Sequence, residues 1–464
     1  MSIFRKSAVS AALVSLLLAS TQPVWAETVA GAMAKTYANN PDLNAARAAL
    51  RAIDENVTIA KAAMRPQVNG VAEANATRRQ FDKAVSSGFG QPSKRSDTFT
   101  SSFGVSITQQ IFDGFQTLNR VRSAEANVLS NRESLRSQEI NLLLNAVEAY
   151  ANIWRDQAIL AIRKKNLAFL REQLNASRAR LQVGEGTQTD VSLAEAQLAQ
   201  AQALLVSAQA ALTTSEAVYF QIVGDQPRNI SQPQPATRGM PRSLDQAVAI
   251  GLRENPQILS AQRSVDSAGY NVKAAEGSLL PGVSIQGDVF RSVNGSTSTN
   301  DHVSGSISAR VTVPLYQGGA EYGQVRQAKE RLGQQRILVD SARLEVQQMI
   351  ISAHTQLEAA RAAIRANQAE IQAANLALQG VVEERNVGQR TTLDVLIAQQ
   401  TVLDAQESLV ISQRVAVVAS YSLLAAMGQL TVRGQNLKVA EYRAEEHYEA
   451  VKDKWFGLRT VDGR

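Results

Sequence analysis

The nine residues VGEGTQTDV (183–191) recur in the same chain as VGQRTTLDV (387–395), and both stretches fit the pattern V-G-x-x-T-x-x-D-V. Glycine favours the left-handed backbone that ends a helix, so Gly184 and Gly388 indicate tight turns. Asp190 and Asp394 lie near the start of a following helix, where the helix dipole favours a carboxylate. A doubled turn of this kind is the sign of an internal repeat.

The segments that lead into these turns are expected to be long helices. They are rich in Ala, Gln, Leu, Glu and Arg, and apolar residues recur every seven positions. The first series is Val121, Val128, Leu135 and Leu142, resumed by Ile153, Leu160, Leu167, Leu174 and Leu181; the second is Val325, Leu332, Val339 and Val346, resumed by Leu357, Ile364, Ile371 and Leu378. In both series the spacing of seven residues is interrupted at the corresponding position. An interruption of this kind, a stutter, locally unwinds a supercoil. Each helix is expected to be on the order of 100 Å long.

Two stretches that alternate apolar and polar residues precede each long helix. In the first copy they run from Val68 and from Phe99, and in the second from Val283 and from Ile307. Polar loops, Asp82–Asp97 and Asn294–Val303, join the members of each pair. Alternation of period two predicts strands with one apolar face, and each is long enough for the ~10 residues that cross a membrane as tilted β-structure.

The repeat divides the chain into two copies with a linker between them. The first copy is 27–223: a helix, strands near 67–81 and 98–112, a long helix near 116–183 and a return helix near 190–222. The linker is 224–241. The second copy is 242–428: a helix, strands near 282–293 and 304–315, a long helix near 320–387 and a return helix near 394–427. A charged segment, 429–464, follows.

The fold expected is therefore mainly α with a pair of β-hairpins. Four strands cannot close a barrel alone, and open strand edges are not tolerated in lipid, so an oligomer must complete a transmembrane β-barrel. The low aromatic content, 5%, suits helices that pack closely as the staves of a hollow cylinder.

The first 26 residues are expected to be a secretory leader. Arg5 and Lys6 precede an apolar run, Ala8–Ala19, and Val24-Trp25-Ala26 has the small residues of a cleavage site before Glu27. No run of 18 or more apolar residues follows Glu27, so we expect no membrane-spanning helix in the exported chain.

Composition speaks against catalysis, cofactors and nucleic acid. The chain has no cysteine and three histidines, which excludes disulfides and thiol nucleophiles. The histidines are expected in a hairpin loop (His302), a long helix (His354) and the charged tail (His447), so no pair has metal-ligand spacing. No phosphate-binding glycine loop occurs. The net charge of +6 is spread along the chain, without the basic stripe that binds nucleic acid.

Strands joined to helices of this length predict a conduit that extends well beyond a membrane core of ~30 Å. Taken alone, the heptads favour a soluble periplasmic coiled-coil adaptor or an adhesin stalk. The strands, the repeat and the leader reverse this preference, so the leading interpretation is a membrane channel for export. An enzyme is a distant third, because no cluster of acid, base and nucleophile can be assembled from the sequence.

The sequence resembles the TolC family of outer-membrane efflux channels. The resemblance rests on the two V-G-x-x-T-x-x-D-V turns, on Asn40-Pro41 with Pro66, on Asn255-Pro256 with Pro281, and on the strand exits Phe112–Gly114 and Tyr316–Gly318. It implies a homotrimer in the outer membrane of a Gram-negative bacterium, in contact with outer-membrane lipid. The strands of the three chains would form a transmembrane β-barrel, and their helices would be the staves of a periplasmic α-barrel. It also implies a periplasmic adaptor and an inner-membrane pump, of RND or ABC type, that supplies the energy for drug efflux or protein secretion through a passive channel.

The resemblance also implies roles for residues of the two turns, which form the periplasmic tip in the family. Adaptor docking falls on Val183, Gly184, Thr187, Val387, Gly388 and Thr391, and gating falls on Asp190, Arg390 and Asp394. Arg390 is expected to pair with Asp190 as a weak latch across neighbouring hairpins; the alternative is that both are solvated charges at helix starts. Several copies of Asp394 around a narrow tip would favour cations. Where the family often has a second acid and an aromatic residue, this chain has Ile397 and Arg385.

Overall fold

A computed structural model describes residues 27–85, 93–294 and 301–463. The leader expected at 1–26 and the centres of both strand loops lie outside these residues. The chain forms two compact units, and each contains parts of both sequence copies. Unit 1 comprises the residues up to Ala45, Arg136–Asn255 and Leu344–Glu441, and unit 2 comprises Ala46–Leu135, Pro256–Arg343 and Tyr442–Arg464.

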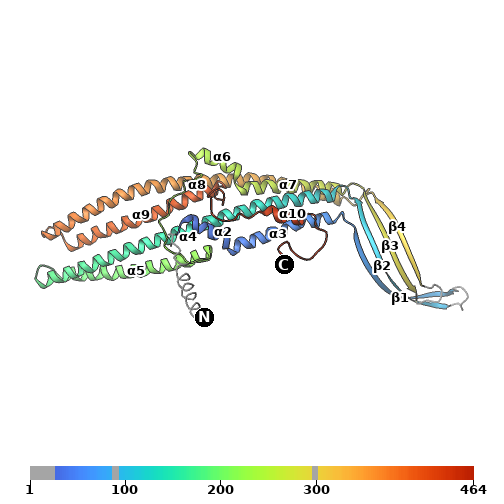
Figure 1. Ribbon diagram of the computed structural model, residues 1–464, viewed down its shortest axis with the longest axis horizontal. Coiled ribbons are helices and arrows are strands. Elements are labelled where there is room, and N and C mark those ends of the chain that lie inside the picture. The colour runs from blue at the N-terminus through green and yellow to red at the C-terminus, as the bar shows by residue number, and fades with distance from the viewer. Residues whose placement is uncertain (1–26, 86–92, 295–300, 464) are drawn as a thin grey trace, which may run out of the picture. The chain divides into compact units, whose positions relative to one another are not determined.

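Unit 2 contains one antiparallel sheet of four strands in the order β1-β2-β3-β4 (Figure 1). The strands are β1 (Gln67–Val85), β2 (Ser93–Phe112), β3 (Gly282–Asn294) and β4 (His302–Thr312). The pairing of β2 with β3 joins the two sequence copies, because Val105 lies opposite Val289. β1 and β2 are longer than expected, whereas β4 ends at Thr312 instead of near 315.

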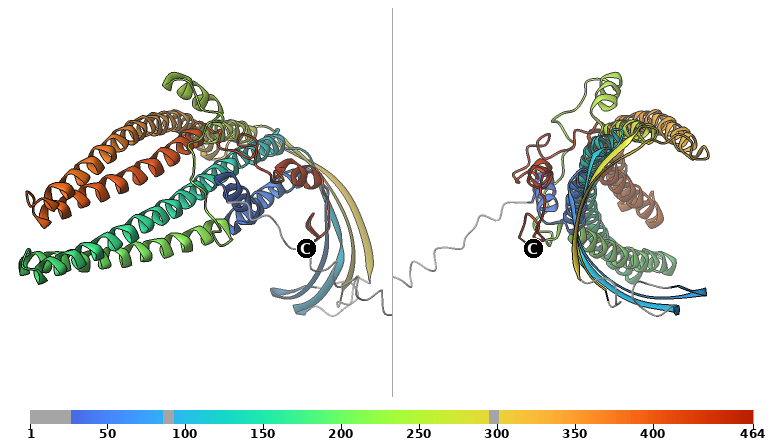
Figure 2. Two further views of the ribbon diagram at one scale, coloured as in Figure 1. Left: turned by 60° about the vertical axis from the view of Figure 1, so that its left-hand side comes forward. Right: turned by 90° about the vertical axis from the view of Figure 1, so that its right-hand side faces the viewer.

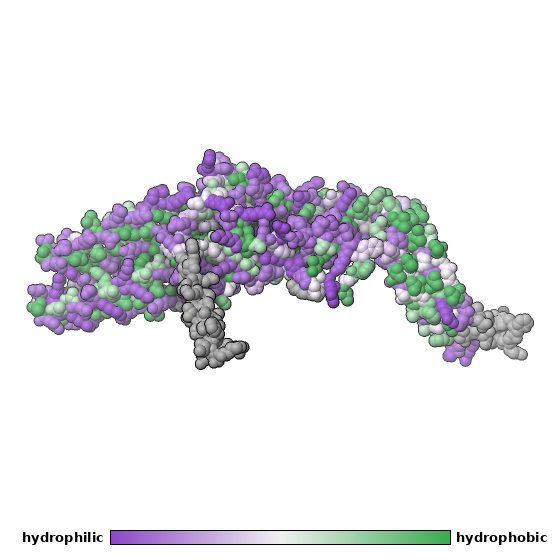
Figure 3. Space-filling model, viewed as in Figure 1, coloured by the Kyte–Doolittle hydropathy of each residue, from purple (hydrophilic) through white to green (hydrophobic). Residues whose placement is uncertain are grey.

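The register gives the sheet one apolar and one polar face. Val68 lies opposite Ile107, and Val283 opposite Val311, so the apolar series of all four strands share one side. The other side carries Asn69, Glu73, Ser102, Ser106, Gln286, Asp288, Ser306 and Arg310. Phe103 and Ile307 are among the apolar side chains left exposed. Figure 2 shows that the sheet is curved, and Figure 3 shows hydrophobic residues gathered over the strands.

Two helical hairpins account for most of the remaining chain. They are α4 (Gln116–Gln182) with α5 (Gln188–Val223), and α8 (Ala320–Asn386) with α9 (Thr392–Ala426). The buried members of the heptad series are Val128, Leu135, Ile153, Leu167, Leu174, Val325, Val339, Val346 and Leu357. In unit 1, Leu167 and Leu170 of α4 pack with Ala201 of α5 and Leu396 of α9. The heptad positions therefore form the contacts between these helices.

Each copy begins with two helices, where the sequence predicted one. They are α2 (Val29–Asn39) and α3 (Pro41–Ala62) in the first copy, and α6 (Leu244–Glu254) and α7 (Pro256–Gly277) in the second. The break falls at Asn40-Pro41 and Asn255-Pro256, because a residue before proline is disfavoured in helical conformation.

The asparagines at these two helix breaks, Asn40 and Asn255, are buried. Each is hydrogen-bonded to the C-terminal end of a return helix. The Asn40 Nδ2 donates to the Ile222 carbonyl at 3.0 Å, and the Asn255 Nδ2 donates to the Ala426 carbonyl at 2.8 Å. The Asn40 Oδ1 accepts from the Asp42 amide at 2.9 Å, which caps the start of α3. The Asn-Pro pair thus joins the first helices of each copy to its last.

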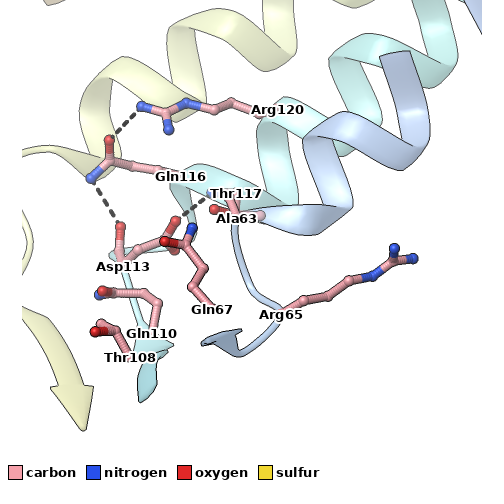
Figure 4. A pocket seen from close by; sticks show the side chains of 9 residues that line it. All are labelled: Ala63, Arg65, Gln67, Thr108, Gln110, Asp113, Gln116, Thr117 and Arg120. Carbon is pink, nitrogen blue, oxygen red and sulfur yellow. Dashed lines mark hydrogen bonds between the residues drawn. The ribbon is translucent and has the colours of Figure 1, made fainter. Parts of the chain in front are cut away.

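A capped turn joins β2 to α4 in unit 2. The Asp113 Oδ2 accepts from the Thr117 amide at 2.6 Å, and the Gln116 Nε2 donates to the Asp113 carbonyl at 3.0 Å (Figure 4). The Arg120 Nη2 donates to the Gln116 Oε1 at 3.0 Å. These side chains line a polar cavity of about 390 Å³ together with Ala63, Arg65, Gln67, Thr108, Gln110 and Thr117. The turn needs Gly114, which has a φ of +68°.

Helix α9 qualifies the expectation of no membrane-spanning helix. It contains a window with a mean hydropathy of 1.6, which is apolar enough to cross a membrane by length and composition, and 44% of this window is buried in the chain. Among its buried residues are Val417, Leu423 and Leu424, so the packing of unit 1 accounts for much of this hydropathy. The last helix, α10 (Ala444–Val451), belongs to unit 2.

Replacing Gly277 by alanine should destabilise unit 2 by about 1–3 kcal/mol, because the added methyl would meet the Gly114 carbonyl oxygen. The measurement is thermal unfolding in detergent, followed by circular dichroism. Gly269→Ala is the matched control in the same helix, where nothing lies within 4 Å of an added Cβ, and it should be neutral or stabilising. Equal melting temperatures for the two variants would contradict the close approach.

Candidate functional site

The two repeated turns have the same backbone geometry. Gly184 and Gly388 have φ values of +80° and +81°. The Gly184 amide donates to the Leu181 carbonyl at 3.1 Å and the Glu185 amide to the Arg180 carbonyl at 2.9 Å. The corresponding bonds at the second turn measure 3.0 and 2.9 Å. Each long helix therefore ends in a left-handed glycine cap that satisfies its last carbonyl groups.

Both return helices begin with a capping box. The Thr187 Oγ1 accepts from the Asp190 amide at 3.2 Å, and the Asp190 Oδ2 accepts from the Thr187 amide at 3.1 Å. Thr391 and Asp394 make the same reciprocal pair at 3.2 and 2.9 Å. The helices consequently start at Gln188 and Thr392, two residues earlier than expected. The signal was present in the sequence, because a Thr with an acid three residues later is a helix-start pattern.

These caps stabilise the charged form of both aspartates. Hydrogen bonds from Thr187 hold the pKa of Asp190 below its ordinary value, and those from Thr391 do the same for the pKa of Asp394. Burial of Asp190 opposes the shift, and the nearby Arg180 adds to it. Both tip acids are thus negative at neutral pH.

The described residues do not bring Arg390 and Asp190 together as a pair. The Arg390 Nε donates to the Glu384 Oε2 at 2.7 Å, and this bond raises the pKa of Arg390. The sequence patterns did not single out Glu384, which lies in the last turn of α8, just before the turn that contains Arg390. The latch between Arg390 and Asp190 stays a prediction, and Glu384 is the competing partner within one chain.

A polar contact joins the ends of the two hairpins in unit 1. The Arg385 Nη1 donates to the Gln173 Oε1 at 2.5 Å, and the Arg180 Nη2 donates to the Asn386 Oδ1 at 3.4 Å. Burial, together with the charge of Arg180, lowers the pKa of Arg385. Arg385 thus lies between the hairpins and not in solvent, and Gln173 is a tip residue that no sequence pattern singled out.

The residues expected to dock an adaptor lie on the surface of the turns. Val183 and Val387 are 70% and 72% exposed, and nothing lies within 4 Å of a Cβ added at Gly184 or Gly388. Thr187 and Thr391 are exposed beside them. Each turn therefore presents one apolar side chain beside a glycine. The two surfaces differ in charge, because Glu185 and Gly186 of the first turn correspond to Gln389 and Arg390 of the second.

The histidines do not form a metal site within the described residues, where no group of three or more His, Asp or Glu side chains could hold an ion. His302 is the first residue of β4, and His354 lies in α8. The His447 Nδ1 lies 2.9 Å from the Asp54 Oδ2, a pair that is almost fully buried beneath α10.

Comparison with known proteins gives consistent results over most of the chain. A family model described as outer membrane efflux protein matches residues 33–225 and 250–429. The chain is 46% identical to the outer membrane efflux protein BepC of Brucella suis, over 98% of this chain and 97% of that protein. It is 26% identical to the outer membrane protein TolC of Vibrio cholerae, over 91% and 94% of the two chains.

The fold is also similar to solved structures. The CmeC outer membrane channel of Campylobacter jejuni superposes with a TM-score of 0.75, at 16% identity, over 92% of this chain and 89% of that chain.

The capping box of α9 predicts that the first turn of this helix loses its cap at low pH. Thr391→Ala should shift the midpoint of this pH dependence. A lowered carboxyl pKa means that the cap of α9 is fully formed above the ordinary pKa of Asp, near 3.9, and is lost as pH falls through the lowered value. Thr391→Ala removes two of the bonds and should move this midpoint upward. The measurement is amide hydrogen exchange of peptides that start at 392, corrected for intrinsic rates. Thr401→Ala, in the same helix, should leave the midpoint unchanged; pH-independent protection at 392–396 would refute the assignment.

Proposed function

The chain belongs to the outer membrane efflux protein family, and from that premise we propose that it works as a homotrimeric, passive export conduit gated at its two tip turns. It is an outer-membrane efflux channel of a Gram-negative bacterium. The proposal adds the number of chains, the partners and the gate. The channel itself performs no catalysis in this proposal, so energy comes from elsewhere in the assembly.

The two-faced sheet with open edges is the observation that carries the proposal. Within the described residues, β1 and β4 each have one neighbouring strand, so each leaves a row of backbone groups unpaired. Unpaired backbone groups cost several kcal/mol each in a bilayer, so β1 of one chain must pair with β4 of another. Three chains are the number that the family resemblance implies.

The polar face of the sheet would line the conduit. Ser102, Ser106 and Asp288 lie on this face, while Phe103 and Ile307 lie on the opposite one. A water-filled lumen and a lipid-facing exterior need this division of side chains. A soluble coiled-coil stalk is not favoured, because it would leave the exposed phenylalanine and isoleucine side chains of the sheet in water.

We assign adaptor docking to the exposed turn surfaces that contain Val183 and Val387. A small apolar side chain beside a glycine permits close approach of a partner backbone. Six turns, each with an exposed valine beside a glycine, would be present in a trimer. The adaptor would connect them to an inner-membrane pump of RND or ABC type, and the pump would select the cargo, whether drugs or secreted proteins.

Gating is assigned to Asp190, Arg390 and Asp394 at the same turns. Arg390 bonded to Glu384 represents a released state in this proposal, and Arg390 bonded to Asp190 of a neighbouring hairpin represents the closed state. Exposed ion pairs are weak and screened by salt, so such a latch can be broken by a docking partner. The aspartates also give the tip a negative potential that favours cations.

Single-channel conductance in planar bilayers tests the gate. Arg390→Ala and Asp190→Asn should each raise the conductance, because each removes one side of the latch. Glu384→Gln should lower it or leave it unchanged, because it frees Arg390 for Asp190. Thr187→Ala is the control that weakens the cap of α5 and keeps the charge. If all four variants had the conductance of the unmodified protein, these residues would not form the gate. The proposal of a conduit would be unaffected.

Adaptor binding tests the docking surface. The double variant Val183→Asp with Val387→Asp should lose binding to the adaptor by tenfold or more, about 1.4 kcal/mol, while channels of ordinary conductance remain. The measurement is surface binding of purified adaptor to reconstituted channels. The matched control is Val206→Asp, a valine of α5 that is 63% exposed and distant in sequence from the turn. Unchanged affinity in the double variant would show that docking occurs elsewhere.

A further inference from the structure

The C-terminal segment 452–459, KDKWFGLR, has a fixed backbone and exposed apolar side chains. Phe456 is 88% exposed, Trp455 is 63% exposed, and Leu458 is fully exposed. Chain ends are usually poorly ordered unless contacts hold them, and exposed apolar clusters are uncommon without a partner surface. A segment that is held by contacts and still exposes three apolar side chains indicates that another surface covers these side chains.

Contacts to α3 hold this segment, and all of them lie within unit 2. The Lys61 Nζ donates to the Asp453 Oδ1 at 2.6 Å and to the Lys452 carbonyl at 3.0 Å. The Arg65 Nη1 donates to the Lys454 carbonyl at 2.8 Å. The Lys454 Nζ closes the loop by donating to the Arg459 carbonyl at 2.7 Å. The segment is therefore fixed to the last turn of α3 and to the turn that connects α3 with β1.

This attachment places the aromatic side chains at the level where the sheet begins. The Arg65 guanidinium lies 4.7 Å from the centre of the Trp455 ring, and β1 starts two residues later, at Gln67. Val68 is the first residue of the apolar face. In the right-hand view of Figure 2, the described part of the C-terminal segment, drawn in red, lies on the convex side of the curved sheet. The outer surface of a barrel is convex, so this is the side that faces lipid.

We propose that residues 452–459 are an interfacial anchor that inserts Trp455, Phe456 and Leu458 into the periplasmic leaflet of the outer membrane. Tryptophan is enriched at membrane interfaces, where its ring is apolar and its N–H can bond to water or headgroups. Lys452, Lys454 and Arg459 outnumber Asp453 in the segment, which suits anionic phospholipid headgroups. The anchor is continuous with the apolar face of the sheet and goes beyond the channel function, although it relies on the outer-membrane location.

Depth-dependent quenching of Trp455 tests this anchor. Residues 27–464 contain two tryptophans, Trp154 and Trp455, so Trp154→Phe leaves Trp455 as the reporter. The protein is reconstituted in vesicles of phosphatidylethanolamine and phosphatidylglycerol that contain lipids brominated near the headgroup or near the chain ends. Quenching should be strong, and stronger with the shallow bromines, because the ring is interfacial. Trp455→Phe, with Trp154 as reporter, is the control that should remain unquenched.

Two further variants separate insertion from mere proximity. Phe456→Ser with Leu458→Ser should reduce the quenching of Trp455 by about twofold or more, because interfacial binding scales with buried apolar area. Phe456→Leu with Leu458→Met should retain it. Channel conductance should be unchanged in both, which separates this anchor from the conduit and the gate.

Absence of quenching at both depths would overturn the anchor. If Trp455 were then equally shielded from aqueous acrylamide in vesicles and in detergent micelles, a neighbouring copy of the chain would be the surface that covers it. Unchanged quenching in the serine variant would also overturn the role of Phe456 and Leu458.

Discussion

Unpaired strand edges are the constraint on which the rest of this structure depends. A four-stranded sheet that is apolar on one side can enter a bilayer only if both edges find partners, and the part of one chain that the structure describes supplies none. In the proposed channel, association would therefore be part of the fold and not an addition to it. The half-buried heptad residues, such as Leu160 and Ile364, are consistent with this requirement, since further helices can complete their burial.

Much of the fold could be predicted from the sequence because its signals are periodic and occur twice. Alternation at Phe99–Ile111 placed one face of β2, and the recurrence of Val128 and Leu135 placed the buried side of α4. The membership of the family was also correctly identified from the doubled turns and the Asn-Pro pairs. Periodic patterns can be recognised in a single sequence because each of them extends over many residues.

The details that escaped prediction depend on contacts between distant segments. The sequence showed Asn40-Pro41 but not that its amide would hold the end of α5, and it showed Arg390 but not the choice of Glu384. Exposed ion pairs differ little in free energy, so no periodicity in the sequence shows which carboxylate an exposed arginine contacts. The boundaries of the compact units likewise do not coincide with those of the sequence repeats, because each unit is formed by packing between segments of both copies.

The asparagine contacts have a consequence for the order in which the chain can fold. The bond of Asn40 to Ile222 spans 182 residues and that of Asn255 to Ala426 spans 171, so each copy closes on itself once its own return helix has been exported. The contact of His447 with Asp54 spans 393 residues, so it must await nearly the whole chain. Contacts of long sequence separation form slowly. Vectorial export therefore favours closure of the first copy, then of the second, with the packing of α10 on α3 as the last step.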